Sequence, residues 1–68
     1  MVLERFAKKI RSLRERSGMT QESFANEINM DRTYYAAVEN GKHNISLKNI
    51  EKIANGFGIT LEELFKDV

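Results

Sequence analysis

The residues of this chain that could do chemistry on a ligand are hydrogen-bond donors. Directly after Asp31 the sequence runs Arg32-Thr33-Tyr34, which places a guanidinium and two hydroxyl groups close together. Arginine can form two parallel hydrogen bonds to guanine, and threonine can bond to a base or touch a thymine methyl group. The segment therefore predicts recognition of base edges by hydrogen bonds.

Groups suited to enzymatic chemistry are scarce. The chain has one histidine, His43, and no cysteine, so a cysteine nucleophile, a disulfide framework and a Cys-ligated zinc site are excluded. No glycine-rich phosphate loop follows a strand, and no paired acid and base have a spacing that suggests a site. We therefore expect no enzyme, no catalytic residue, no cofactor and no metal site.

Size and composition indicate one small soluble domain. A chain of 68 residues buries a core that is only marginally stabilising, which makes a partner subunit plausible. With 41% hydrophobic and 31% charged residues, the chain should fold. No apolar run approaches the roughly 18 residues that span a bilayer, and the N-terminus lacks the apolar region of a signal peptide. We expect a cytoplasmic protein with no membrane partner.

The charge distribution says more than the net charge of +1. Residues 1–48 hold nine Lys/Arg against six Asp/Glu, whereas residues 49–68 hold two against four. This asymmetry favours a polyanionic partner on the N-terminal side, although scattered solvated charge is the plainer alternative.

Five helices and no sheet are expected to position these groups. Apolar residues at helical spacing alternate with capping residues and with Asn or Gly stops. Gly56 falls inside the fourth helix and should weaken its last turn by about 1 kcal/mol relative to alanine. The predicted helices cover about 2–16, then the segments from Thr20 to Asn29, from Asp31 to about Glu39, from Ser46 to Gly58, and from the Thr60–Glu63 capping box onward.

The inward faces follow from the same spacing. Neighbouring helical residues point about 100° apart, so Tyr34 and Tyr35 cannot both face one way; we assign Tyr34 to the ligand and Tyr35 to the core. The predicted core residues are Leu3, Phe6, Ala7, Ile10 and Leu13; Phe24, Ala25 and Ile28; Tyr35 and Val38; and Leu47, Ile50, Ile53, Ala54 and Phe57.

The second and third helices are separated by Asn29, Met30 and Asp31 alone. A turn this short forces the helices to cross steeply, as in a helix-turn-helix unit, and Ala25 provides the small side chain needed at their approach. Among DNA-binding proteins such a unit places its second helix in the major groove. The polar residues of this segment would then face DNA.

Several segments together resemble the Cro/repressor (XRE-type) helix-turn-helix family. They are Thr20 to Ala25, Asp31 to Tyr35, Val38 to Lys42, Ile53-Ala54 and Gly58 to Phe65, and they cover nearly the whole chain. The resemblance implies an all-α, compact five-helix lambda-repressor-like DNA-binding domain over residues 1–68. It also implies a transcriptional regulator that binds double-stranded DNA as a homodimer. Asp31 to Tyr34 and Asn44 to Ser46 are further similar to controller proteins of restriction-modification systems.

Two positions depart from the family pattern. Asn29 occupies a turn position where glycine is more common, which is tolerated at a small cost in backbone strain. Tyr35 stands where the family usually buries an aliphatic residue, so either its hydroxyl reaches a partner at the surface or the core is adjusted around it.

The site residues follow from the expected helices and the resemblance. The base-contacting candidates are Arg32, Thr33, Tyr34, Ala36 and Ala37; the phosphate-contacting candidates are Gln21, Asn40, Lys42, His43, Asn44 and Ser46. The resemblance implies an ion pair between Arg14 and Glu39 that holds the recognition helix in register. It also implies a dimer interface that includes Ile59, Leu61 and Phe65.

Other functions remain open at this point. A phage-type repressor shares the same fold, and an antitoxin-like protein-interaction module could retain the helix-turn-helix for packing alone. RNA polymerase is a candidate further partner of a regulator.

Overall fold

The computed structural model describes residues 2–68, so Met1, the first residue of the predicted domain, lies outside the described residues. Within this range the chain forms five helices and no strand, as predicted. They are α1 (Val2–Arg16), α2 (Gln21–Glu27), α3 (Arg32–Glu39), α4 (Leu47–Phe57) and α5 (Leu61–Phe65).

The helices start where their capping side chains lie. The Thr60 hydroxyl accepts a hydrogen bond from the Glu63 N–H at 3.0 Å, and the Glu63 carboxylate accepts one from the Thr60 N–H at 2.9 Å. A second capping box joins Thr20 to Ser23. The Thr20 cap was predicted from the sequence, but this box was not, because serine rather than glutamate or glutamine stands at the third helical position.

The turn between α2 and α3 has the conformation that its length requires. Asn29 adopts a left-handed conformation with φ of 56°, as expected for the residue that ends α2. The Met30 N–H then donates to the Ala25 carbonyl oxygen at 2.9 Å. Because Asn29 reverses the chain within a few residues, α3 starts immediately at the Asp31 cap.

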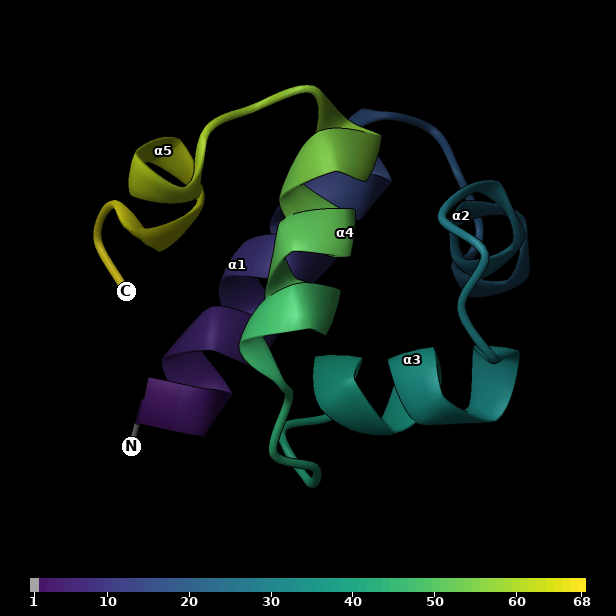
Figure 1. Ribbon diagram of the computed structural model, residues 1–68, viewed down its shortest axis with the longest axis horizontal. Coiled ribbons are helices and arrows are strands. Elements are labelled where there is room, and N and C mark those ends of the chain that lie inside the picture. Colours follow the sequence, from purple (N-terminus) through teal and green to yellow (C-terminus); the bar gives the residue numbers. More distant parts are fainter. Residues whose placement is uncertain (1) are drawn as a thin grey trace.

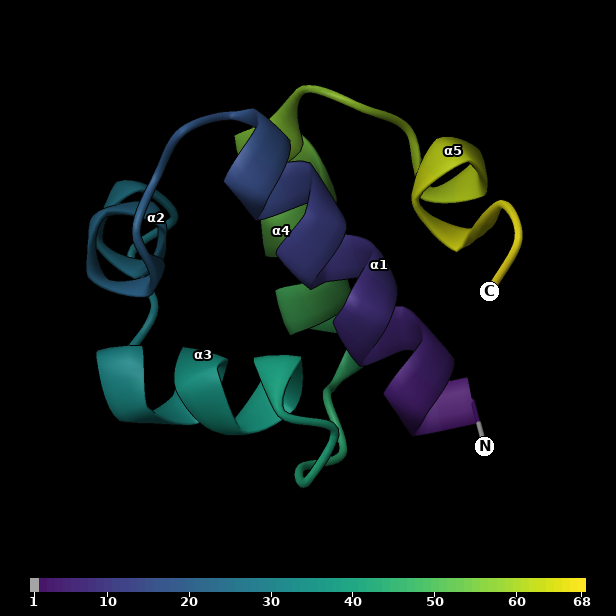
Figure 2. The same cartoon turned by 180° about the vertical axis from the view of Figure 1, so that it is seen from behind.

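Helices α2 and α3 lie on one side of α1 and α4, and α5 lies on the other (Figure 1). The reverse view gives the same division and places α3 along one edge of the molecule (Figure 2). Among residues 2–68, every helix is too short or too polar to cross a lipid bilayer.

All five helices contribute to one apolar core. The buried hydrophobic residues are Phe6, Ala7, Ile10, Phe24, Ala25, Ile28, Met30, Tyr35, Val38, Ile53, Ala54 and Leu64. Leu47 was expected in this core, but it is 71% exposed. The inward stripe of α4 loses burial toward the start of the helix: Ile53 is fully buried, Ile50 is half-buried, and Leu47 lies one further turn out, beyond the core.

Gly56 allows α4 to approach α2 closely. A Cβ at this position would overlap with Ile28 Cγ2 and would lie about 3.0 Å from the Phe24 ring. Phe24 also stacks on Phe57, with ring centroids 4.2 Å apart. The weak helix propensity of Gly56 is therefore offset by close packing between two helices, which the sequence alone did not indicate.

Candidate DNA-binding surface

Helix α3 has a buried face and an outward face. Tyr35, Val38 and Glu39 are buried, whereas Arg32 and Thr33 are exposed at the start of the helix. Ala36 and Ala37 are half-buried, so the middle of the outward face is nearly flat. The helix start is fixed by the Asp31 carboxylate, which accepts a hydrogen bond from the Tyr34 N–H at 2.9 Å. Because α3 lies along one edge of the molecule, the base-contacting candidates on this helix lie along the same edge (Figure 2).

The loop after α3 continues this edge. All the loop candidates for phosphate contact are exposed: Asn40, Lys42, His43, Asn44 and Ser46. Two of them also hold the local structure. The Asn40 side-chain oxygen accepts a hydrogen bond from Arg11 at 3.2 Å, and the Ser46 hydroxyl caps α4 by accepting from the Asn49 N–H at 3.2 Å.

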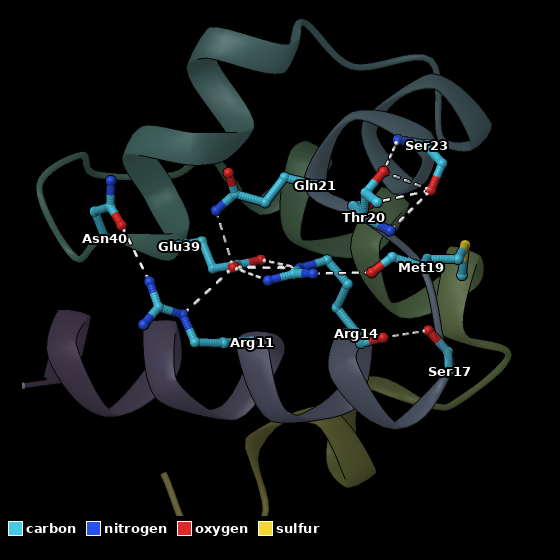
Figure 3. A network of polar contacts seen from close by, with 9 residues as sticks. All are labelled: Arg11, Arg14, Ser17, Met19, Thr20, Gln21, Ser23, Glu39 and Asn40. Carbon is cyan, nitrogen blue, oxygen red and sulfur yellow. Dashed lines mark hydrogen bonds and ion pairs between the residues drawn. The ribbon is translucent and has the colours of Figure 1, made fainter.

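Arg14 of α1 and Glu39 of α3 are joined by a bidentate ion pair (Figure 3). Arg14 Nε donates to Glu39 Oε2 at 2.9 Å, and Arg14 Nη2 donates to Glu39 Oε1 at 2.8 Å. Arg14 Nη1 also donates to the Met19 carbonyl oxygen at 2.8 Å. One guanidinium therefore ties the last turn of α3 to α1 and to the connection that leads into α2.

Gln21 and Arg11 are further polar neighbours of Glu39 that were not predicted from the sequence. Gln21 Nε2 donates to Glu39 Oε1 at 3.0 Å, and Arg11 Nε lies 3.5 Å from the same oxygen (Figure 3). Gln21 was expected to contact a phosphate; one of its amide hydrogens is directed to Glu39, which leaves the other for an external acceptor. Nothing in the spacing of Gln21 or Arg11 indicated these contacts, because they join different helices.

The electrostatics of this cluster follow from its burial. The Glu39 side chain is 0% exposed. Burial raises the pKa of its carboxyl group, but hydrogen bonds from Arg14 and Gln21 and the adjacent Tyr35 hydroxyl outweigh that effect and lower the pKa to about 2. The hydrogen bonds to Glu39 raise the pKa of Arg14 in turn. Both groups are charged at neutral pH.

Tyr35 belongs to the core, as its position on α3 predicted. Its side chain is fully buried, and its ring centroid lies 5.3 Å from that of Phe24. Among the described residues its hydroxyl has no partner with hydrogen-bond geometry, although it lies close to Glu39 and Arg14. Burial raises the pKa of Tyr35 well above its usual range. The hydroxyl of Tyr35 therefore does not reach a partner at the surface but ends inside the molecule, beside Glu39 and Arg14.

Arg32 is only weakly held. Its Nη1 lies 3.8 Å from Glu22 Oε2 on α2, and the two side chains are 67% and 62% exposed. An exposed pair at this distance contributes little stability. The guanidinium of Arg32 can therefore be redirected to a ligand at low cost.

Tyr34 is held more firmly than its neighbours on the outward face. Its side chain is half-buried, and its hydroxyl accepts a hydrogen bond from Asn49 Nδ2 at 3.2 Å. Its ring makes an edge contact with His43, with centroids 5.1 Å apart. Asn49 was not among the predicted site residues, because only the folded chain brings the start of α4 to α3.

The residues expected at a dimer interface lie on or beside α5. Leu61 and Phe65 are each 38% exposed and stand four positions apart on the helix. Phe65 also stacks on Phe6 at 5.4 Å, and Ile59 is half-buried against the core. Leu61 and Phe65 are thus partly exposed apolar residues of α5. This helix lies on the side of the molecule away from α2 and α3 (Figure 1).

The family model for helix-turn-helix proteins matches residues 10–64, which include α2, the short turn and α3. The chain belongs to the XRE-type helix-turn-helix family. Among curated relatives, this helix-turn-helix protein is similar to the control protein C.MunI of a Mycoplasma species. The two are 57% identical over 65 residues, which cover 94% of this chain and 88% of C.MunI.

Solved structures of controller proteins share the fold. The restriction-modification controller protein C.AhdI from Aeromonas hydrophila superimposes with a TM-score of 0.88 at 41% identity, covering 93% of this chain and 96% of C.AhdI. The controller protein C.Esp1396I, solved as a tetramer in complex with its natural 35-base-pair operator, gives a TM-score of 0.89 at 32% identity. That match covers 97% of this chain and 87% of C.Esp1396I.

Proposed function

We propose that this protein is a sequence-specific DNA-binding transcriptional regulator that acts as the controller protein of a restriction-modification system. The observation that carries this proposal is the outward placement of Arg32 and Thr33 at the start of α3. The far end of this helix is fixed by the hydrogen bonds of buried Glu39 with Arg14 and Gln21. Rigid presentation of hydrogen-bonding side chains is what reading of base edges requires. The similarity to restriction-modification control proteins supports the narrower biological role.

The proposed contacts divide into two kinds. Arg32, Thr33 and Tyr34, with the flat surface of Ala36 and Ala37, would meet base edges in the major groove. The phosphate contacts would come from Gln21, Asn40, Lys42, His43, Asn44 and Ser46. Phosphate contacts would position α3 and make the affinity depend on salt, whereas base contacts would supply discrimination.

The active species would be a homodimer on a palindromic operator. Leu61 and Phe65, with Ile59 beside them, would form the two-fold interface, so that two copies of α3 enter major grooves about 34 Å apart. The acidic C-terminal end of the chain, with Glu62, Glu63 and Asp67, would then lie away from the DNA. As part of the same proposal, the protein works in the cytoplasm without enzymatic activity and influences transcription with RNA polymerase as a further partner.

Selection from a random-sequence duplex pool tests this proposal directly. Duplexes retained by the wild-type protein should share an inverted repeat, and fluorescence anisotropy should give an affinity that falls steeply between 50 and 200 mM salt. Replacement of Arg32 with alanine should weaken binding of the selected duplex more than binding of a random duplex. Lys66→Ala removes one positive charge from the opposite side of the molecule and serves as the matched control. Failure to select any sequence, together with binding insensitive to salt, would refute the proposal and favour a protein-interaction module.

A further inference from the structure

Asn49 connects the start of α4 to the outward face of α3. It is the third residue of α4, and its backbone N–H donates to the Ser46 cap. Its side chain is therefore not needed for capping, and Asn49 Nδ2 instead donates to the Tyr34 hydroxyl at 3.2 Å. His43, from the loop between the two helices, packs its ring edge-on against the Tyr34 ring. We refer to Tyr34, His43 and Asn49 as the Tyr34 clamp.

The direction of the Asn49–Tyr34 hydrogen bond determines what Tyr34 can offer to a ligand. A tyrosine hydroxyl has one hydrogen to donate and lone pairs that accept. Because the amide of Asn49 donates, the hydroxyl acts here as an acceptor and keeps its own hydrogen available. DNA presents acceptors at its phosphate oxygens and at several base positions in the major groove. A tyrosine hydroxyl that accepts a hydrogen bond from the protein can therefore still donate its hydrogen to DNA. If the protein residue were an acceptor, it would already use that hydrogen.

We propose, on the basis of the proposed function, that Asn49 is a positioning residue for DNA recognition. It holds the Tyr34 hydroxyl in place as an acceptor, so that Tyr34 donates its hydrogen to an acceptor on DNA. His43 limits rotation of the same ring from the loop side. Asn49 acts only through Tyr34 and makes no direct contact with DNA.

The clamp also reduces the entropy that binding would otherwise cost. An exposed tyrosine loses side-chain freedom when it is fixed at an interface, and a side chain that is already fixed loses less. Tyr34 is half-buried and is held by Asn49 and His43 in the free chain, whereas Arg32 is held by a weak ion pair with Glu22. From this effect and the loss of hydroxyl orientation, removal of the Asn49 amide should weaken DNA binding by about 3- to 10-fold.

A double-mutant cycle on DNA affinity tests the inference. The proteins are wild type, Asn49→Ala, Tyr34→Phe and the double variant, and the probes are the duplex selected by the wild-type protein and a random duplex of equal length. Asn49→Ala should lose about 3- to 10-fold in affinity when Tyr34 is present and less than about twofold when it is phenylalanine. Asn55→Ala, an exposed asparagine on the same helix, is the matched control and should leave the affinity unchanged.

The same cycle with Asn49→Asp separates orientation from helix stability. Aspartate keeps the size of the side chain and is favourable near a helix N-terminus, but its ionised carboxylate only accepts hydrogen bonds. It should therefore accept the hydrogen of the Tyr34 hydroxyl and weaken DNA binding more than alanine does. The loss of affinity caused by Asn49→Asp should be larger when Tyr34 is present than in the Tyr34→Phe background, and the difference measures this effect. Urea unfolding of each variant confirms that it is folded during the titration.

The outcomes are distinct. Coupling on both duplexes supports the inference with a phosphate as the acceptor, and coupling confined to the selected duplex supports it with a base as the acceptor. Equal losses from the Asn49 variants with and without the Tyr34 hydroxyl would overturn it, because Asn49 would then contact DNA directly or act on stability. If wild-type protein selects no duplex, the proposed function itself is wrong, which is a different result from an additive cycle.

Discussion

Loss of the Arg14 side-chain charge should destabilise the protein by about 3 kcal/mol at neutral pH. The Arg14→Met variant retains most of the aliphatic length but leaves the Glu39 carboxylate buried without its main partner. The pKa of Glu39 falls from 4.5 to about 2 in the folded chain, which corresponds to about 3 kcal/mol of stability. Breaking a buried pair by removing one partner typically costs about 3–5 kcal/mol, which is the same magnitude.

The pH dependence of this loss identifies its cause. Because the pKa of Glu39 is lower in the folded chain than in the unfolded chain, its stabilisation is complete above pH 4.5 and is lost as the pH falls toward 2. In Arg14→Met, burial should instead favour the neutral carboxyl group, so that acid relieves the defect. The difference in unfolding free energy between wild type and variant should therefore shrink by about 2 kcal/mol between pH 7 and pH 3.

Urea unfolding followed by circular dichroism measures both quantities. Arg16→Met removes the same charge from an exposed position in the last turn of α1 and should change stability by less than about 0.5 kcal/mol. A loss below about 1 kcal/mol for Arg14→Met, or a loss that does not depend on pH, would refute the view that Glu39 is a buried charge held by Arg14. A total stability of about 3–10 kcal/mol for a chain of this size makes the predicted change easy to detect.

Three further changes probe recognition, packing and assembly. Arg32→Ala should weaken binding of the selected duplex by about 1–3 kcal/mol in an anisotropy titration; equal losses on selected and random duplexes would exclude Arg32 as a base-reading residue. Gly56→Ala should destabilise the protein by about 1–3 kcal/mol in urea, despite a better helix propensity, because its Cβ would overlap with Ile28; a gain in stability would contradict this account. Phe65→Glu should shift the protein toward monomer in sedimentation experiments, while Leu47→Glu, which is more exposed, should leave assembly unchanged; if both variants behave alike, α5 is not the interface.

The sequence by itself was sufficient for the helices and for the turn that gives the family its name. Thr20, Asp31, Ser46 and Thr60 all cap helices where predicted, and Asn29 adopts the left-handed conformation expected of it. These signals are local, because a cap or a turn depends on groups within about four residues of one another. The division of Tyr34 and Tyr35 between surface and core is equally local, since it follows from the helical repeat.

How deeply a residue at the end of a helix is buried was decided by the tertiary structure. Leu47 and Ile53 share the apolar stripe of α4, yet Leu47 is 71% exposed and Ile53 is fully buried. Periodicity reports which face of a helix is apolar and carries no information about how far neighbouring helices extend along that face. The role of Gly56 could not be predicted for the same reason, because its close neighbour Ile28 lies at the end of another helix, α2.

The polar clusters beside α3 also depended on the fold. The sequence suggested the pairing of Arg14 with Glu39 through family resemblance, but it gave no indication that Gln21 joins this pair or that Asn49 holds Tyr34. Each of these contacts joins side chains that are distant along the chain and approach one another only when separate helices pack together. Local sequence determined which helices form, and the packing of those helices determined which polar groups meet, because hydrogen bonds between helices depend on distances that local propensity does not encode.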